Sequence, residues 1–479
     1  MRFYGRDGLI RQLQDLWGKR VSSFVTCRGR RRIGKSTLIA RFAMLSEARF
    51  IRIEGVKPNE TTTDEDERAY FATQLAEQTG AESSCPSNWL NALIRLSKEI
   101  RDDQRTVVLL DEVSWMAHFD RMFSGMLKIA WDNYLKPHDN LIFVVCGSVS
   151  SWIKEEIIDN RAFYGRRSAD IVVPELPLCE CAKFWGEALD RLATKEMLDV
   201  LSVTGGVPRY LEEVNPSLSA SENLRRMCFL PNAPLRVDFD EMFTDVVTRQ
   251  QRLCAKILRC LVDGAHTITE IASGTKVEKG GDISKALSQL AECGMVSPDT
   301  GKNPETGAVI REKRYRLRDN YSRFYLKYIE PNKDTIDSGG YVFTGLDQFA
   351  GWDAIMGLQF ENLIVNNYRD ILAPLHLENV IVNSAAPFMQ KATKAKGKGL
   401  QIDLLVQTNM SICVVEIKRR SHIGREIIDE VKEKCRRLRH QSGVSVRTAL
   451  VFDGELVRSV EADGFFDAIV PIRSLLKIP

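Results

Sequence analysis

The sequence predicts a multidomain α/β protein, and three observations support that fold class. A glycine-rich stretch at residues 29–37 lies between a short apolar run and a helical pattern. A second apolar run ends in two acids, Asp111 and Glu112, and further apolar runs after residue 351 carry isolated acids. Buried strands with polar carboxyl ends are typical of sheets that bind ligands at that edge. We therefore expect two α/β regions with a mainly helical part between them.

Composition limits the classes of protein that need to be considered. The 479 residues allow two to four domains, and a net charge of +3 means that any nucleic-acid surface must come from local clustering. The 11 cysteines show no paired CxxC spacing, which favours reduced thiols and a cytoplasmic location. No apolar run reaches the roughly 18 residues that span a bilayer. The first residues lack the apolar segment of a signal peptide, so we expect none. Together with the lack of a spanning run, this predicts no membrane partner.

The stretch GRRRIGKST fits the pattern G-x-x-x-x-G-K-[ST]. Residues 23–27 before it predict a short buried strand and residues 38–43 after it a helix, so the loop would hold phosphates at a helix N-terminus. Lys35 would reach the β- and γ-phosphates of ATP, and the Ser36 hydroxyl would bind Mg²⁺. A Gly/Arg-rich surface turn is the alternative. The residues expected to line the nucleotide are Gly29, Arg30, Arg31, Arg32, Ile33, Gly34, Lys35, Ser36 and Thr37.

The segments beside this loop are less specific. Leu9, Ile10, Leu13 and Leu16 have helical spacing, which predicts an amphipathic first helix or a lid helix beside the adenine. Residues 54–68 are polar and acidic, and we expect a solvated loop there. Helical patterns follow at about 69–79 and 88–101.

The apolar run at residues 106–110 leads into Asp111 and Glu112. Asp111 would bind Mg²⁺ directly or through water, and Glu112 would polarise the attacking water as a general base. A strand ending in Asp-Glu is weak evidence alone. It becomes strong because it follows a phosphate loop by about 70 residues.

Two further polar positions follow. Residues 141–147 predict a third strand, after which Ser148 would sense the γ-phosphate or only cap a helix. Arg166 lies in a basic turn and would stabilise transition-state charge, in its own chain or from a neighbouring subunit, unless the turn is simply solvated. Gly205-Gly206 would end one helix, and Pro208 would start the next. The helical region at about 175–235 is predicted to be the lid of the nucleotide site.

These motifs resemble those of the archaeal and bacterial AAA-type ATPases related to the STAND NTPases. The resemblance covers residues 1–235 and rests on FYGRD, GRRRIGKST, LLDE, the GS after the third strand, YGR and GGVPRYL. It implies a P-loop parallel sheet with a helical lid, and ATP hydrolysis. The family often carries a second serine after the GS, where this chain has Val149.

Residues 236–330 predict a different domain. Helical patterns at 254–262, 267–272 and 282–293 precede a hairpin from 295–296 to 315–317, which reads as a winged helix. Helix 282–293 would read DNA, or the domain would be a protein-packing adaptor. The adaptor is favoured because Lys285 is the only base among the residues of the recognition face, which are Ser284, Lys285, Ser288 and Gln289. Residues 331–350 look like a linker.

The last region, residues 351–479, contains acids within apolar runs. Glu361 lies in a helical pattern, Asp403 in a strand at 401–406, and Glu416 with Lys418 in a strand at 412–418. Positions i and i+2 of a strand share a face, and buried acids need a compensating partner. If the three acids and the lysine converge on Mg²⁺, each of these four charged residues has a compensating partner.

The predicted chemistry follows from the residue types. Asp403 and Glu416 would hold one or two Mg²⁺ ions, with Mn²⁺ also possible, and the metal would activate water against a phosphodiester. Lys418 would orient that water, and Glu361 would bind metal or the lysine. The alternative is a pair of edge strands with structural ion pairs. Basic residues before Asp403 would contact the DNA backbone, namely Lys391, Lys394, Lys396 and Lys398.

This region resembles the PD-(D/E)xK nucleases, which adopt the restriction-endonuclease-like α/β fold, in the DUF234-type form that is fused to the same ATPases. Asp403, Glu416 and Lys418 fall on the catalytic positions of that family and Glu361 on its helix acid, while Ile402 replaces the usual proline. The sequence hypothesis is an ATP-gated DNA endonuclease, with a homo-oligomer as a candidate assembly. Two alternatives stay open: an ATPase switch whose C-terminal domain binds without cutting, and a winged-helix transcription regulator.

Overall fold

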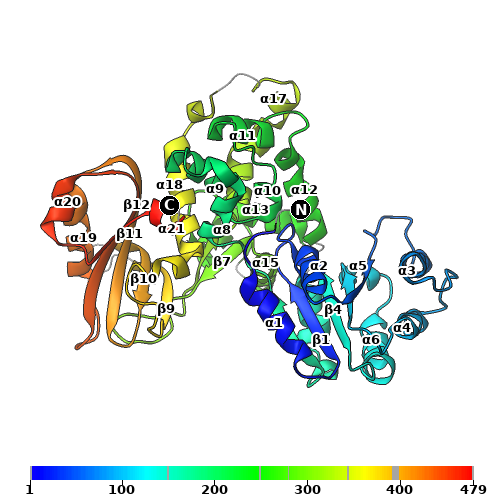
Figure 1. Ribbon diagram of the computed structural model, residues 1–479. Coiled ribbons are helices and arrows are strands. Elements are labelled where there is room, and N and C mark those ends of the chain that lie inside the picture. Colours follow the sequence, from blue (N-terminus) through cyan, green and yellow to red (C-terminus); the bar gives the residue numbers. More distant parts are fainter. Residues whose placement is uncertain are drawn as a thin grey trace. The chain divides into compact units, whose positions relative to one another are not determined.

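The chain folds into two compact units. Figure 1 shows a computed structural model of the chain. The structure describes residues 3–147, 150–246, 250–278, 280–341, 345–390 and 399–476. Residues 5–175 form one unit, here called the N-terminal unit, and the remaining chain forms the C-terminal unit. None of the helices in these described ranges is long and apolar enough to cross a membrane. All 11 cysteines are present as free thiols in the structure.

The N-terminal unit is built on a five-stranded sheet in the order β2-β3-β4-β1-β5, with every neighbouring pair parallel. The three strands predicted from the sequence are confirmed and lie together at its centre. The two outer strands were not predicted, because polar residues interrupt their apolar positions. The strands are β1 Ser23–Arg28, β2 Arg49–Glu54, β3 Thr106–Asp111, β4 Leu141–Gly147 and β5 Arg167–Val172.

Helices cover this sheet. The apolar residues of the first helix are buried, so the predicted amphipathic helix is confirmed. The predicted loop at 54–68 is wrong in part, because Thr63 and Asp66 form a capping box that starts a helix at Asp64. The helices of this unit are α1 Asp7–Trp17, α2 Lys35–Leu45, α3 Asp64–Thr79, α4 Trp89–Lys98, α5 Val113–Met116, α6 Phe123–Ala130 and α7 Ser150–Ile153.

The C-terminal unit begins with the helices that were predicted to be a lid. Gly205 has a φ of 56° and ends a helix, and Pro208 is the first residue of the next, as the sequence predicts. Leu198 and Leu201 are buried in the same core as Leu363 and Val415, far along the chain. The first of these helices therefore share a core with the C-terminal sheet, whereas the last, Pro234–Val246, is buried in the core of the middle helices. The helices are α8 Leu178–Ala182, α9 Thr194–Thr204, α10 Pro208–Leu211, α11 Ala220–Cys228 and α12 Pro234–Val246.

Three helices and a small antiparallel sheet follow, where the sequence predicts three helices and a hairpin. Thr267 caps the second helix in a capping box with Glu270, as expected. The segment 331–350 is more than a linker, because Ile336 and Leu346 are buried in the core of this region. The elements are α13 Gln251–Cys260, β6 His266–Thr267, α14 Ile268–Thr275, α15 Gly281–Glu292, β7 Val296–Asp299, β8 Arg314–Leu317, α16 Asn320–Phe324 and α17 Lys333–Asp337.

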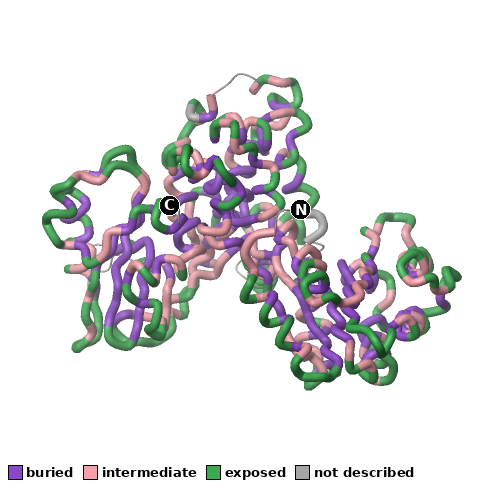
Figure 2. Tube along the Cα trace, viewed as in Figure 1, coloured by how far each residue is buried: buried purple, intermediate pink, exposed green. Residues whose placement is uncertain are grey.

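The chain ends in a mixed five-stranded sheet in the order β13-β12-β11-β10-β9. β9, β10 and β11 pair antiparallel, and β11, β12 and β13 pair parallel. The central strands are buried (Figure 2) because one face packs on α18 and α9 and the other on α19. The elements are α18 Trp352–Asn366, β9 Ser384–Gln390, β10 Leu400–Gln407, β11 Ser411–Ile423, α19 Glu426–Arg437, β12 Ser445–Leu456, α20 Arg458–Asp463, β13 Ala468–Pro471 and α21 Ile472–Leu475.

Candidate functional sites

The glycine-rich loop connects β1 to the start of α2, as predicted. Gly34 has a φ of 86° and Gly29 a φ of 153°, and a Cβ on Gly29 would lie 2.6 Å from the carbonyl oxygen of Val173. Both positions therefore require glycine. The Lys35 Nζ donates to the carbonyls of Gly29 at 3.1 Å and Arg30 at 3.2 Å. The lysine thus lies within the loop, where it can exchange these carbonyls for phosphate oxygens.

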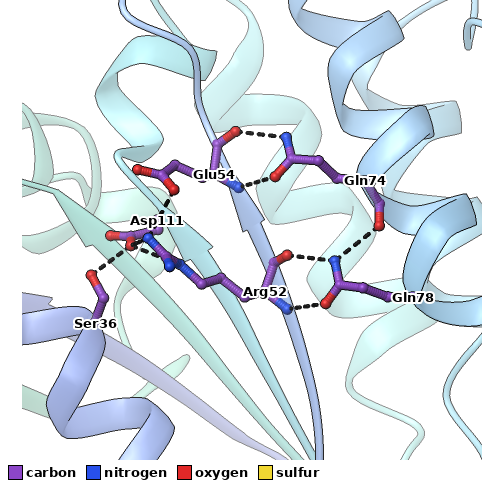
Figure 3. A network of polar contacts seen from close by, with 6 residues as sticks. All are labelled: Ser36, Arg52, Glu54, Gln74, Gln78 and Asp111. Carbon is purple, nitrogen blue, oxygen red and sulfur yellow. Dashed lines mark hydrogen bonds and ion pairs between the residues drawn. The ribbon is translucent and has the colours of Figure 1, made fainter. Parts of the chain in front are cut away.

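Asp111 lies at the carboxyl end of β3 and is only 2% exposed. Its Oδ2 accepts a hydrogen bond of 2.5 Å from the Ser36 hydroxyl (Figure 3). The structure therefore brings together the two residues predicted to hold Mg²⁺. The same oxygen also accepts from Arg52 of β2, from Nη2 at 2.8 Å and Nε at 3.2 Å. Arg52 was not predicted, because the strand that carries it was not recognised.

Glu112, the predicted general base, has a left-handed backbone with φ 51° and ψ 45°. Such a conformation is strained for a residue with a Cβ and is common at functional sites. The carbonyl oxygen of Glu112 packs against Gly55, where a Cβ would lie 2.8 Å from that oxygen. Burial raises the pKa of Glu54; Arg52 opposes that rise, and nearby Asp111 and Glu112 add to it. Acidic groups thus gather at this edge of the sheet.

Two glutamines of α3 complete the free edge of β2. Gln74 bonds the backbone of Glu54 in both directions at 2.9 Å, and Gln78 bonds that of Arg52 at 2.7 and 2.9 Å (Figure 3). These side chains satisfy the edge groups that a sixth strand would otherwise pair. They fix the backbone from which Arg52 and Glu54 reach the site.

Two further nucleotide contacts are predicted from the sequence, Ser148 and Arg166. Ser148 is outside the described residues. Arg166 forms a two-nitrogen ion pair with Asp132, at 2.7 and 2.9 Å, which lowers the pKa of Asp132 to about 2. Arg167 pairs with Phe24 at the amino end of β1, whereas the phosphate loop follows its carboxyl end. Arg166 is therefore remote from the phosphate loop of its own chain, and a role at the phosphates requires a neighbouring subunit.

The C-terminal unit brings the predicted acids near one another. Asp403 of β10 is 8% exposed and Glu416 of β11 is fully buried. The Asp403 Oδ2 accepts from the backbone N–H of Ile417 at 2.9 Å, and Lys418 Nζ lies 2.7 Å from Glu416 Oε1. The charges of Asp403 and Glu416 both act on the carboxyl group of Glu361 of α18. The four residues thus share one region of the sheet and helix, as the pattern predicts.

The charges in this region interact strongly. Burial raises the pKa of Glu361, with a further contribution from Asp403. Burial and Glu416 likewise raise the pKa of Asp403, against Lys434 and Lys418. Carboxylates in such a setting suit a divalent cation, since oxygen donors are the ligands that Mg²⁺ prefers. Within the described ranges, however, no three acidic, His or Cys side chains lie close enough to form a metal cluster.

A second lysine, Lys434 of α19, pairs with Glu416, and its Nζ lies 2.5 Å from Glu416 Oε2. Glu416 is therefore held between two lysines. From sequence alone, Lys434 belongs to a run of basic residues that would extend the DNA-contacting patch or form a solvated helix face, but the structure pairs it with a buried acid. Helical periodicity could have found it, because Ile427, Ile428 and Val431 are buried and Lys434 lies three residues beyond the last of them.

Arg419 of β11 joins two other elements. It pairs with Asp199 of α9 and lies 3.3 Å from Asp453 of β12. It also donates to the Ser202 hydroxyl at 3.3 Å. Arg419 is adjacent in sequence to Lys418, so this contact ties α9 to the strand that carries Glu416 and Lys418.

Buried arginines anchor α18, the helix that carries Glu361. Arg316 of β8 pairs with Asp299 at 3.1 Å and bonds Asn362 of α18. Arg323 is 2% exposed and donates to Gln359 of α18 at 3.0 Å. Arg316 lies on the return strand of the predicted hairpin and faces the protein interior. The bases on or near this strand, here called the basic arm, are Arg311, Lys313, Arg314, Arg316 and Arg318.

The order of the parallel sheet, the glycine loop and the acid-ended strand define the class of the N-terminal part: a P-loop ATPase domain. Residues 3–214 match the model of an ATPase domain family found predominantly in Archaea. The match extends beyond the N-terminal unit into α8, α9 and α10. ATP is the nucleotide that this family implies.

Individual proteins resemble the chain over greater lengths. An uncharacterized protein of Methanocaldococcus jannaschii is 22% identical over 435 residues, which is 89% of each chain. A Walker-type ATPase of Pyrococcus abyssi shares the fold with a TM-score of 0.50 and 15% identity, over 68% of this chain and 96% of the other. The ORC2 protein of Aeropyrum pernix gives a TM-score of 0.43 and 14% identity, over 71% and 96%.

Proposed function

We propose that the chain is an ATP-gated, Mg²⁺-dependent DNA endonuclease. The observation that carries the nuclease part is the buried set of Asp403, Glu416 and Lys418 on two adjacent strands, with Glu361 nearby. Burying carboxylates is unfavourable unless their charge is used or compensated, so such a set favours a functional site. The sequence resemblance to the PD-(D/E)xK nucleases supports the same assignment.

At the nucleotide site, Mg²⁺ would bind between the Ser36 hydroxyl and Asp111, whose oxygens lie 2.5 Å apart. The metal would neutralise phosphate charge and orient the γ-phosphoryl group. Lys35 would exchange the loop carbonyls for phosphate oxygens, and the Glu112 carboxylate would accept the proton of the attacking water. Ser148 and Arg166 stay candidates for sensing the phosphates, Arg166 from a neighbouring subunit of a homo-oligomer.

At the second site, Asp403 and Glu416 would hold Mg²⁺ or Mn²⁺, which would activate water against the phosphodiester. Glu416 must exchange a lysine for the metal, because Lys418 and Lys434 now lie on its two oxygens. Lys418 would then orient the water and stabilise the developing charge. Lys434 would be free to contact a DNA phosphate. The DNA contacts predicted for Lys391, Lys394, Lys396 and Lys398 lie outside the described residues.

The packing of α9 supports the gating part of the proposal. This helix lies within the segment that matches the ATPase family, yet it shares its core with the C-terminal sheet. Its Asp199 pairs with Arg419, the residue after Lys418. A nucleotide-driven shift of α9 would therefore move the strand that carries the proposed nuclease residues.

The middle domain would serve as an adaptor. Arg316 and Arg314 of its basic arm bond protein groups, including Asp299 and the carbonyl of Ala265. Guanidinium groups used in this way are not available for phosphates. The contacts with α18 instead link this domain to the proposed nuclease site.

The test is a metal- and nucleotide-dependence assay with plasmid, linear and single-stranded DNA. Wild type should nick or cut with Mg²⁺ or Mn²⁺, and ATP should change the rate. Lys418→Ala should abolish cutting and leave ATP hydrolysis intact. Lys327→Ala is the matched control, since it removes a lysine paired with Asp263 at 2.9 Å on an unrelated surface. If wild type cuts no DNA or RNA under any of these conditions, the nuclease proposal is wrong.

The second candidate is an ATPase switch whose C-terminal domain binds nucleic acid or a partner without cutting. The lysine pairing of Glu416 favours it, because ion-paired acids can be purely structural. It predicts that Asp403→Ala leaves both nucleic-acid binding and cellular function intact, whereas an endonuclease would lose cellular function.

A further inference from the structure

Arg52 lies where a cation is expected at the nucleotide site. Two of its nitrogens contact Asp111 Oδ2, the same oxygen that accepts from the Ser36 hydroxyl (Figure 3). A carboxylate oxygen has two lone pairs. With Ser36 on one and the guanidinium on the other, this oxygen has no place left for magnesium or for a water bound to it.

Arg52 also has a second partner within reach. The Nη2 that contacts Asp111 donates to Glu54 Oε2 at 2.8 Å. The side chains of Arg52 and Glu54 are 41% and 49% exposed, so they can move into solvent. Their backbones are fixed by Gln78 and Gln74. The guanidinium can therefore leave Asp111 while β2 stays in place and Glu54 keeps the charge paired.

We propose that the Arg52 guanidinium competes with Mg²⁺ for Asp111. When the metal–nucleotide complex binds, the guanidinium leaves Asp111 and stays paired with Glu54. We call the contact between Arg52 and Asp111 the clasp. The clasp neutralises a carboxylate that is 2% exposed and would otherwise be an unpaired buried charge. It also sets the Mg²⁺ concentration at which nucleotide binds tightly. The inference depends on the ATPase domain and is independent of the proposed nuclease.

The test measures binding, not turnover. Full-length protein is titrated with Mg²⁺ in the presence of a fluorescent, non-hydrolysable ATP analogue, and anisotropy gives the Mg²⁺ midpoint. Arg52→Gln should lower that midpoint about fivefold, the effect of removing a partly exposed ion pair. Glu54→Gln removes the alternative partner and should raise the midpoint about two- to threefold. The double variant should behave as Arg52→Gln does.

Arg49→Gln is the matched control, because Arg49 lies on the same strand and donates at 2.6 Å to the carbonyl of Glu99 instead. Its midpoint should equal that of wild type. An unchanged or raised midpoint in Arg52→Gln would overturn the proposal. So would a loss of metal-free nucleotide affinity at constant midpoint, which would make Arg52 a phosphate ligand. Should Arg52→Gln fail to fold by circular dichroism, Arg52→Lys carries the test, with an intermediate midpoint expected.

Discussion

Replacing Glu67 of α3 by glutamine should make the protein more stable at alkaline pH but hardly at acidic pH. Glu67 is 2% exposed, and one of its oxygens accepts from the N–H of Val56 at 3.2 Å. The other has no hydrogen-bond partner among the described residues. Burial raises the pKa of Glu67 from 4.5 to about 7.

The sign and size follow from proton linkage. Between pH 4.5 and 7 the folded protein holds this proton more tightly than the unfolded chain, so stability falls as pH rises and levels off above about 7. A rise from 4.5 to about 7 corresponds to roughly 3 kcal/mol. Glu67→Gln cannot ionise, so it should gain up to about that amount at pH 8 and little at pH 5.

The assay is urea unfolding of the full chain at both pH values, with hydrogen exchange of the α3 amides to locate the effect. Glu77→Gln, at an exposed position of the same helix, is the control and should change neither value. Equal stabilisation of Glu67→Gln at pH 5 and pH 8 would show that the gain has another cause. Destabilisation at pH 8 would mean that the ionised carboxylate is a net stabilising group.

Three further changes test the two sites. Gly55→Ala should lower ATP turnover at least tenfold, because its Cβ would displace the carbonyl of Glu112, while nucleotide affinity measured by anisotropy stays within about twofold. Lys434→Met leaves Glu416 with one cation and should cost about 2 kcal/mol in urea unfolding, which added Mn²⁺ should largely restore. Arg316→Met leaves a buried acid unpaired and should destabilise the C-terminal unit by about 3 kcal/mol in calorimetry, with unchanged ATP binding.

The sequence predicts those parts of the fold in which local pattern and burial agree. The three central strands of the N-terminal sheet contain apolar and small residues that are almost all buried, so they are recognisable without tertiary information. The strand Arg49–Glu54 is not recognisable in this way. Two of its residues point charged side chains to the nucleotide edge of the sheet, and glutamine side chains of another element pair with its free backbone groups. Arg52 was missed for the same reason.

In the C-terminal unit the sequence identifies the acids and one counter-ion, Lys418, but not the second lysine on Glu416 or the acids that pair with Arg419. The apolar runs around Asp403 and Glu416 predict burial, and the structure agrees. Whether Lys434 meets Glu416 depends on how α19 packs, and which acid meets Arg419 depends on α9, more than 200 residues earlier in the chain. Such pairings arise from tertiary structure, and only helical periodicity gave any indication of Lys434.

Both sites share a physical feature that bears on metal binding. Arg52 contacts Asp111, and Lys418 and Lys434 both contact Glu416, so one buried carboxylate at each proposed metal position carries a basic partner. A buried acid without a cation would strongly destabilise the fold. The basic side chains therefore allow the protein to fold before metal arrives, and metal binding becomes an exchange of cations. Affinity for Mg²⁺ should then be weaker than the carboxylates alone would give, and bound phosphate, which attracts the released bases, should strengthen it at both sites.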